Sequence, residues 1–170
     1  MRLTSSAVVI VILLAQFSGG SRVQAEEILP GLLFEQGTIN GVLVRSGEQT
    51  VAVYSEPVSS TKKSVAVLLT HHRRDVVAAA ETAVAAGANV VAPEAERELF
   101  EATDEFWNDF WTKRFHDYAQ QSTKILTEPL KVDRWVKDGD TFDAGGVTFR
   151  MLETPGFTRG AVSYIGETDG

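Results

Sequence analysis

A short apolar strand, an alanine-rich helix and a second apolar strand follow one another mid-chain, and this unit constrains the fold most. Ser64–Thr70 (SVAVLLT) is almost wholly apolar, which is typical of a strand buried on both faces. Asp75–Ala86 predicts a helix that ends before Gly87. Asn89–Ala92 predicts another buried strand, and Pro93 can open a further helix. Helices that cover a sheet are therefore expected.

Further strands are predicted on both sides of this unit. Branched apolar runs separated by glycine predict strands and turns at Leu32–Glu35, Ile39–Arg45 and Thr50–Tyr54. Two later segments, Leu126–Val136 and Thr141–Glu153, also predict strands, with DGD and GG at their turns. The expected class is α/β in a layered α+β arrangement, with a mixed sheet covered by helices.

A long helix is predicted from Pro93 to about Tyr118. Its large side chains recur at steps of three to five residues and form a wide stripe. The stripe consists of Leu99, Thr103, Phe106, Phe110 and Phe115, with Trp107 and Trp111 beside it. Packing of this stripe on a sheet is favoured over a ligand groove.

The first 25 residues have the layout of a secretory signal peptide. Arg2 is followed by the apolar run Ala7–Phe17 and then by a small polar segment that ends in Val23-Gln24-Ala25. The apolar run is shorter than the roughly 20 residues of a spanning helix, so cleavage is favoured over an uncleaved anchor. We expect an exported protein, periplasmic or extracellular, whose mature domain covers residues 26–170 and leaves the membrane after cleavage.

Charge and cysteine content exclude several kinds of site. The formal net charge is −7, and Arg2 and Arg22 both fall in the predicted leader, so the mature domain is more acidic still. Phosphate backbones repel such a domain, so a nucleic-acid partner is not expected. The chain has no cysteine, so a transition-metal site would depend on His, Asp and Glu.

Two motifs follow predicted strands. Thr70-His71-His72-Arg73-Arg74-Asp75-Val76 lies between a buried strand and a helix, where ligands often bind in α/β sheets. Some 80 residues later, Thr154-Pro155-Gly156-Phe157-Thr158-Arg159-Gly160 follows the predicted hairpin. In their order and spacing, and in the hairpin Lys137–Gly156 between them, these motifs resemble the metallo-β-lactamase superfamily. The resemblance covers Leu32–Gly170.

The resemblance implies a partial αββα sandwich and a family metal site. The family's first motif is H-x-H-x-D-H and its third-histidine loop is P-G-H-T-x-G; the ligands hold zinc, which activates water for hydrolysis. Carried over, His71 and Asp75 keep ligand residues, whereas Arg73, Val76 and Phe157 replace histidines. Two further family ligands would lie beyond Gly170, so the domain is expected to lack its C-terminal part.

Two other histidines are candidates for replacement ligands. His72 is next to His71, and His116 lies on the predicted long helix; an ordinary structural histidine is favoured at both positions. Arg73 leaves two alternatives open. Its guanidinium either supplies the lost positive charge beside Asp75 or points to solvent.

These departures predict a non-hydrolytic domain with a binding or structural function and no cofactor. The alternatives are a zinc hydrolase, whose ligands come from His71, His72, Asp75 and residues outside this chain, or a truncated fragment of one. A half-fold leaves one sheet face uncovered, so self-association through that face is also expected. The sequence indicates no substrate, because fold does not determine function.

Overall fold

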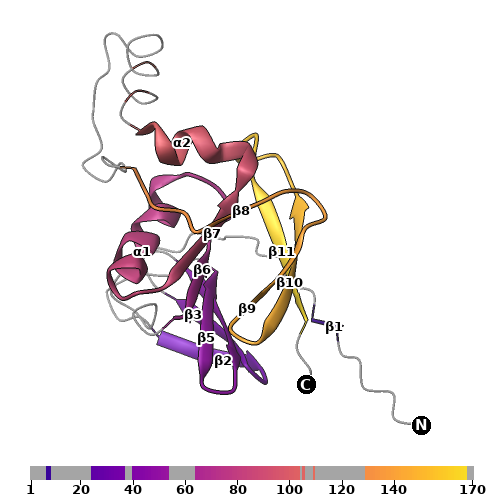
Figure 1. Ribbon diagram of the computed structural model, residues 1–170. Coiled ribbons are helices and arrows are strands. Elements are labelled where there is room, and N and C mark those ends of the chain that lie inside the picture. Colours follow the sequence, from indigo (N-terminus) through magenta and orange to yellow (C-terminus); the bar gives the residue numbers. More distant parts are fainter. Residues whose placement is uncertain are drawn as a thin grey trace.

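The computed structural model describes residues 7–8, 24–36, 40–53, 64–103, 105, 109 and 129–167. Two sheets lie face to face, and helix α1 covers the outer side of the larger one (Figure 1). The larger sheet has seven strands in the order β2-β3-β4-β5-β6-β7-β8, and the smaller has four in the order β1-β11-β10-β9. The expected layered architecture of helix on mixed sheet is confirmed. No helix among the described residues is long and apolar enough to cross a membrane.

The seven-stranded sheet changes from antiparallel to parallel pairing at β5. Its first four strands form antiparallel hairpins: β2 Gln24–Leu29, β3 Leu32–Gln36, β4 Gly41–Ser46 and β5 Gln49–Val53. The remaining three pair in parallel: β6 Ala66–Leu68, β7 Asn89–Pro93 and β8 Arg134–Val136. The predicted strand–helix–strand unit is therefore a parallel crossover, with α1 Arg74–Ala85 between β6 and β7. Gly87 ends that segment with φ of 90°, as its position predicts.

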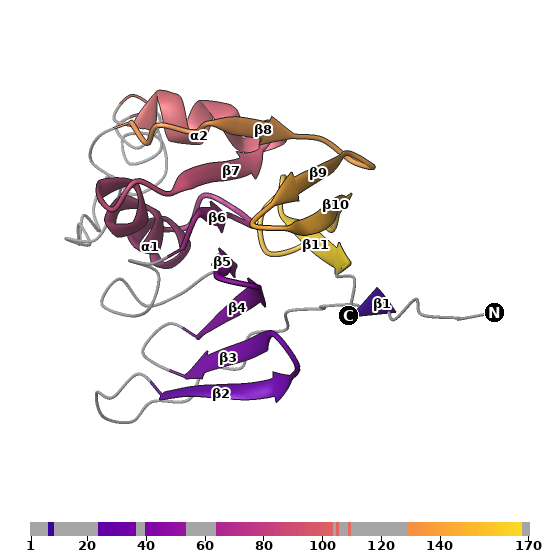
Figure 2. The same cartoon turned by 60° about the horizontal axis from the view of Figure 1, so that its bottom comes forward.

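The four-stranded sheet is antiparallel throughout. Its strands are β1 Ala7–Val8, β9 Thr141–Ala144, β10 Val147–Glu153 and β11 Val162–Glu167. The GG turn joins β9 to β10, and Gly145 and Gly146 both have positive φ there. Figure 2 shows this sheet packed against the parallel part of the larger one, while β2 and β3 extend away from it.

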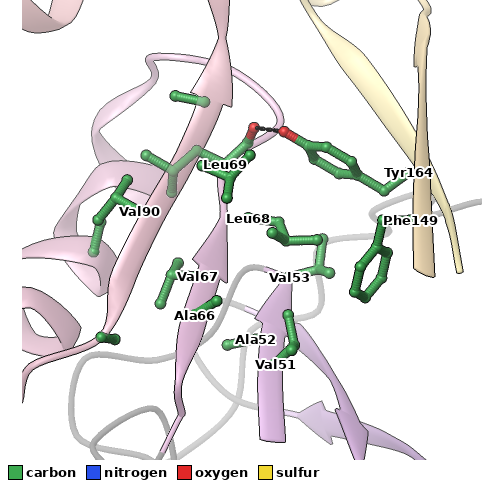
Figure 3. Close-up of a cluster of buried hydrophobic side chains, with 14 of the residues drawn as sticks. Val51, Ala52, Val53, Ala66, Val67, Leu68, Leu69, Val90, Phe149 and Tyr164 are labelled. Atoms are coloured by element: carbon green, nitrogen blue, oxygen red, sulfur yellow. Dashed lines mark hydrogen bonds between the residues drawn. The ribbon is translucent and has the colours of Figure 1, made fainter. Parts of the chain in front are cut away.

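One hydrophobic core fills the space between the layers. Leu68 and Val53 extend toward Phe149 of β10, whereas Val67 and Val90 extend toward α1 (Figure 3). Leu68, Val67 and Phe149 have no exposed surface. Consecutive residues of the central strands are thus buried on both faces, which explains the unbroken apolar run.

Two predicted elements differ from the structure. The predicted helix of residues 93–118 begins later and is interrupted: Pro93 ends β7, a 3-10 helix covers Glu94–Glu96, and α2 covers Arg97–Glu101. After a bend at Ala102, the described residues Thr103, Glu105 and Asp109 are again helical. The hydroxyl of Thr103 donates to the carbonyl of Phe100 at 3.1 Å, which favours a break after α2. The aromatic stripe from Phe106 to Phe115 lies outside the described residues.

The predicted strand Leu126–Val136 is also too long. Among the described residues of this segment, 129–136, Arg134–Val136 forms a strand and residues 129–133 do not. Pro129 cannot donate to a ladder. The carboxylate of Asp133 accepts the Val90 amide at 2.9 Å, so this residue caps the neighbouring strand with its side chain. Strand β2 was not predicted, because its described side chains are all exposed and give no apolar pattern.

Candidate functional site

The two motifs meet at the carboxyl ends of β6 and β7. Leu69 and Thr70 follow β6 directly, and their carbonyls accept hydrogen bonds from β11, the strand after the second motif. The amide of Val162 donates to the Thr70 carbonyl at 2.9 Å. The hydroxyl of Tyr164 donates to the Leu69 carbonyl at 2.9 Å (Figure 3). The Tyr164 hydroxyl is buried, which raises its pKa above the ordinary value, so it remains a donor. These bonds fix the end of β6 against β11.

His71, Arg73 and Phe157 form a small stack at this junction. The ring centroids of His71 and Phe157 are 4.8 Å apart, and the Arg73 guanidinium carbon lies 4.8 Å from the Phe157 centroid. His71 is buried, whereas Phe157 is 64% exposed and Arg73 is exposed. The amide of Arg73 donates to Nδ1 of His71 at 3.4 Å. The stack is therefore buried at the histidine and open to solvent at the arginine and phenylalanine.

Glu96 lies beside the stack and is only 2% exposed. Its Oε2 accepts the backbone amide of His72 at 2.5 Å and lies 2.9 Å from Nδ1 of the same residue. Its Oε1 accepts the hydroxyl of Thr158 and the amide of Gly160, the latter at 3.3 Å. One carboxylate thus contacts the first loop, residues 70–73, through His72, and the second loop, residues 154–160, through Thr158 and Gly160.

These contacts decide the charge state of Glu96. Burial alone would raise its pKa, but the hydrogen bonds from His72 and Thr158 and the nearby imidazole outweigh burial, so the pKa lies below the ordinary value. The group is therefore an ionised carboxylate at neutral pH. A buried carboxylate with several donors avoids most of the penalty of an unpaired charge.

Three of the sequence-predicted positions are brought together, and others are not described. His71, Arg73 and Phe157 are in contact. Asp75 and Val76 lie in the first turn of α1, but their side chains fall outside the described residues, as does all of His116. His72 points to Glu96, which is an ordinary structural contact.

The described donors do not fit a zinc ion. Across the part of the chain that the structure describes, no three side chains of His, Cys, Asp or Glu lie close enough to hold a metal. At the second loop the position facing His71 is a phenyl ring, which has no donor atom. Nδ1 of His71 accepts the Arg73 amide. A structural zinc site needs about four ligands and a catalytic one about three.

Sequence reasoning missed Glu96, and it placed Gly160 in the second motif without giving it a function. Glu96 is one of four glutamates within Glu94–Glu101, and nothing in the sequence separates it from the others. Gly160 carries a stronger signal, because it closes the second motif. A Cβ there would lie 2.5 Å from Cγ of Glu96 and 3.1 Å from Cβ of Ala95, so only glycine fits.

A pocket of about 320 Å³ lies at the ends of β7 and β8. It is bordered by Glu94, Lys137, Asp138 and Glu153, with apolar side chains among its other walls. The lining contains none of His71, Arg73 and Phe157, so the pocket is separate from the stack.

Neither a protein-family model nor a curated protein matches the sequence of this chain. Solved structures do match its fold. A metallo-β-lactamase from Cronobacter sakazakii with a HARLDQ motif superposes with a TM-score of 0.62 at 22% identity, covering 84% of this chain and 59% of that one. A β-lactamase from Chitinophaga pinensis superposes with a TM-score of 0.64 at 19% identity, and the match covers 92% of this chain and 63% of that one. A class B3 di-zinc metallo-β-lactamase from an Alaskan soil metagenome superposes with a TM-score of 0.63 at 21% identity, and the match covers 85% of this chain and 57% of that one.

The chain therefore has the metallo-β-lactamase fold, as the two motifs predict. It spans less than two thirds of the length of each of these neighbours. Within that fold, residues 71–76 (HHRRDV) share three letters at the same spacing with the HARLDQ motif of the Cronobacter protein. The shared letters are His71, Arg73 and Asp75.

Proposed function

We propose that this protein is an exported domain of the metallo-β-lactamase fold that acts by binding or by structural contact, without zinc and without hydrolysis. The observation that carries the proposal is the ring of Phe157 against His71 at 4.8 Å. A phenyl ring occupies the place where the family resemblance expects the third imidazole. The ring supplies no donor and covers the imidazole that is left.

The charge of Arg73 adds to this argument. A guanidinium is permanently charged and repels Zn²⁺. Two unit charges about 4 Å apart interact by about 4 kcal/mol at an effective dielectric constant of about 20, and a divalent ion doubles the repulsion. The Cronobacter protein is called a metallo-β-lactamase although its motif also has arginine at this spacing. Arg73 alone therefore does not exclude the enzyme class, and Phe157 is the decisive position.

The same residues support a binding function. The described residues provide no ion-pair partner for the Arg73 guanidinium, which lies over an aromatic ring that is 64% exposed. A planar cation beside an exposed ring suits a carboxylate attached to an apolar or aromatic group. Such a ligand would meet both groups from solvent.

Metal content and activity of the purified protein test the proposal. We expect no stoichiometric zinc after dialysis, and no hydrolysis of lactam or thioester substrates. The double variant Arg73→His/Phe157→His should gain zinc affinity, because it rebuilds three imidazoles with His71. Arg159→His, an exposed arginine in the same loop, is the matched control and should gain none. About one zinc per wild-type chain, lost in His71→Ala, would refute the proposal and favour the zinc hydrolase alternative.

Export is tested separately. The layout of residues 1–25 predicts cleavage after Ala25, so the intact mass of exported protein should correspond to a chain that begins at Glu26. Cleavage there would leave Glu26–Leu29 of β2 in the mature protein. A full-length species retained in the membrane would argue for an uncleaved anchor.

A further inference from the structure

We propose that Glu96 does the bridging that a metal ion would otherwise do: its carboxylate holds the first loop, 70–73, to the second loop, 154–160. Glu96 is then a positioning residue for the stack of His71, Arg73 and Phe157. The proposal concerns how the site keeps its shape, and it holds whatever ligand the site takes.

The contacts of Glu96 fall on the immediate neighbours of the stacked rings. His72 follows His71, and Thr158 follows Phe157. Glu96 accepts from both His72 and Thr158, through different oxygens. The hydrogen bonds that link His72, Glu96 and Thr158 therefore lie beside the contact between His71 and Phe157, and they fix the separation of its two rings.

The bridge joins segments that are far apart in sequence. Glu96 lies 24 residues from His72 and 62 from Thr158. It enters the site from the 3-10 helix Glu94–Glu96, directly after β7, so a third segment of the same sheet edge is included. A ligand-bearing metal joins loops in the same manner, by drawing donors from several segments to one centre.

The surroundings of Glu96 are shaped for a carboxylate. Two backbone amides, one hydroxyl and one imidazole nitrogen converge on its two oxygens. Gly160 gives the Glu96 side chain its space, because a Cβ there would lie 2.5 Å from Cγ of Glu96. Charge-assisted bonds of this kind are about twice as strong as neutral ones. Loss of the acceptor should therefore release both loops locally.

Amide hydrogen exchange in the purified full protein tests this, because His72 and Gly160 donate their own amides to Glu96. Glu96→Met keeps side-chain length and removes the acceptor. We expect exchange at both amides to rise about tenfold or more, with little change in β10 and β11. Glu96→Gln keeps one carbonyl acceptor and should restore part of the protection. The nuclear Overhauser contact between the His71 and Phe157 rings should weaken in parallel.

Asp133→Asn is the matched control, since Asp133 also accepts a backbone amide, that of Val90, away from the loops. It should leave the amides of His72 and Gly160 unchanged. Should Glu96→Met not fold, Thr158→Val removes one bond of the bridge and should raise exchange at Gly160.

Three results would overturn the proposal. If the amides of His72 and Gly160 exchanged in Glu96→Met at the same rate as in the wild type, the carboxylate would not be what holds the loops. An equal rise throughout β10 and β11 would show a general core contribution. Slower loop exchange on addition of zinc to the wild-type protein would show that a metal organises the loops. The exchange pattern in the variants is independent of zinc content and activity, so the bridge and the proposed function can fail separately.

Discussion

Gly160→Ala should destabilise the protein, although glycine-to-alanine changes often stabilise one. The new Cβ would lie 2.5 Å from Cγ of Glu96, 3.1 Å from Cβ of Ala95 and 3.3 Å from the Ala95 carbonyl carbon. Two of these atoms belong to Ala95, which has no flexible side chain to move aside. Overpacking of this kind costs about 1–3 kcal/mol. The lower entropy of the unfolded alanine variant offsets about 0.4–1 kcal/mol. A net loss of about 1–2 kcal/mol is expected.

Gly156→Ala provides the control within the same loop. Gly156 is exposed, its φ lies outside the left-handed region, and nothing lies within 4 Å of a Cβ built on it. This variant should be neutral or up to about 1 kcal/mol more stable. Urea unfolding of the two variants and the wild type measures the difference. Equal midpoints for Gly160→Ala and Gly156→Ala would refute the close packing of Glu96 against the second loop.

Two further predictions concern the same contacts. Tyr164→Phe removes the hydroxyl that donates to the Leu69 carbonyl and should cost about 1–2 kcal/mol in urea unfolding; an unchanged midpoint would show that this bond between the sheets contributes nothing. The pKa of Glu96 is lowered from 4.5, so its contribution to stability is complete above that value and is lost as pH falls through the lower folded-state pKa. Stability of the wild type should therefore fall more steeply than that of Glu96→Gln as the pH falls below 4.5, and parallel curves would contradict the assignment.

The central strands could be predicted because burial on both faces leaves a plain signal. Runs of branched apolar residues locate β3, β5, β6 and β7 to within a few residues. Gly87 marks the end of the α1 segment by the same logic, since its φ of 90° favours glycine. These features depend on local sequence and on burial, and a stretch of a few residues is enough to reveal both.

Elements that depend on other segments were predicted poorly. The predicted helix is interrupted at Ala102, between α2 Arg97–Glu101 and the helical residue Thr103, whose hydroxyl donates to the Phe100 carbonyl. The segment before Arg134 has strand-like residues, but β8 begins only at Arg134. At Asp133 the carboxylate accepts the Val90 amide, and the Asp133 amide donates to the Val90 carbonyl. The periodicity of apolar residues does not predict such side-chain contacts.

The site shows the same division between local and distant causes. The motif spacing predicts that Arg73 and Phe157 stand where the family has histidines, because each lies in a short pattern whose neighbouring residues match the family. What the replacements do depends on contacts across the fold, since Arg73 and Phe157 meet only after the second loop has folded over the end of β6. The second motif has the glycines and the threonine that the family resemblance expects around a third histidine, and two of these residues, Thr158 and Gly160, donate to Glu96. These motif residues therefore lead to the buried carboxylate of Glu96, which contacts both loops.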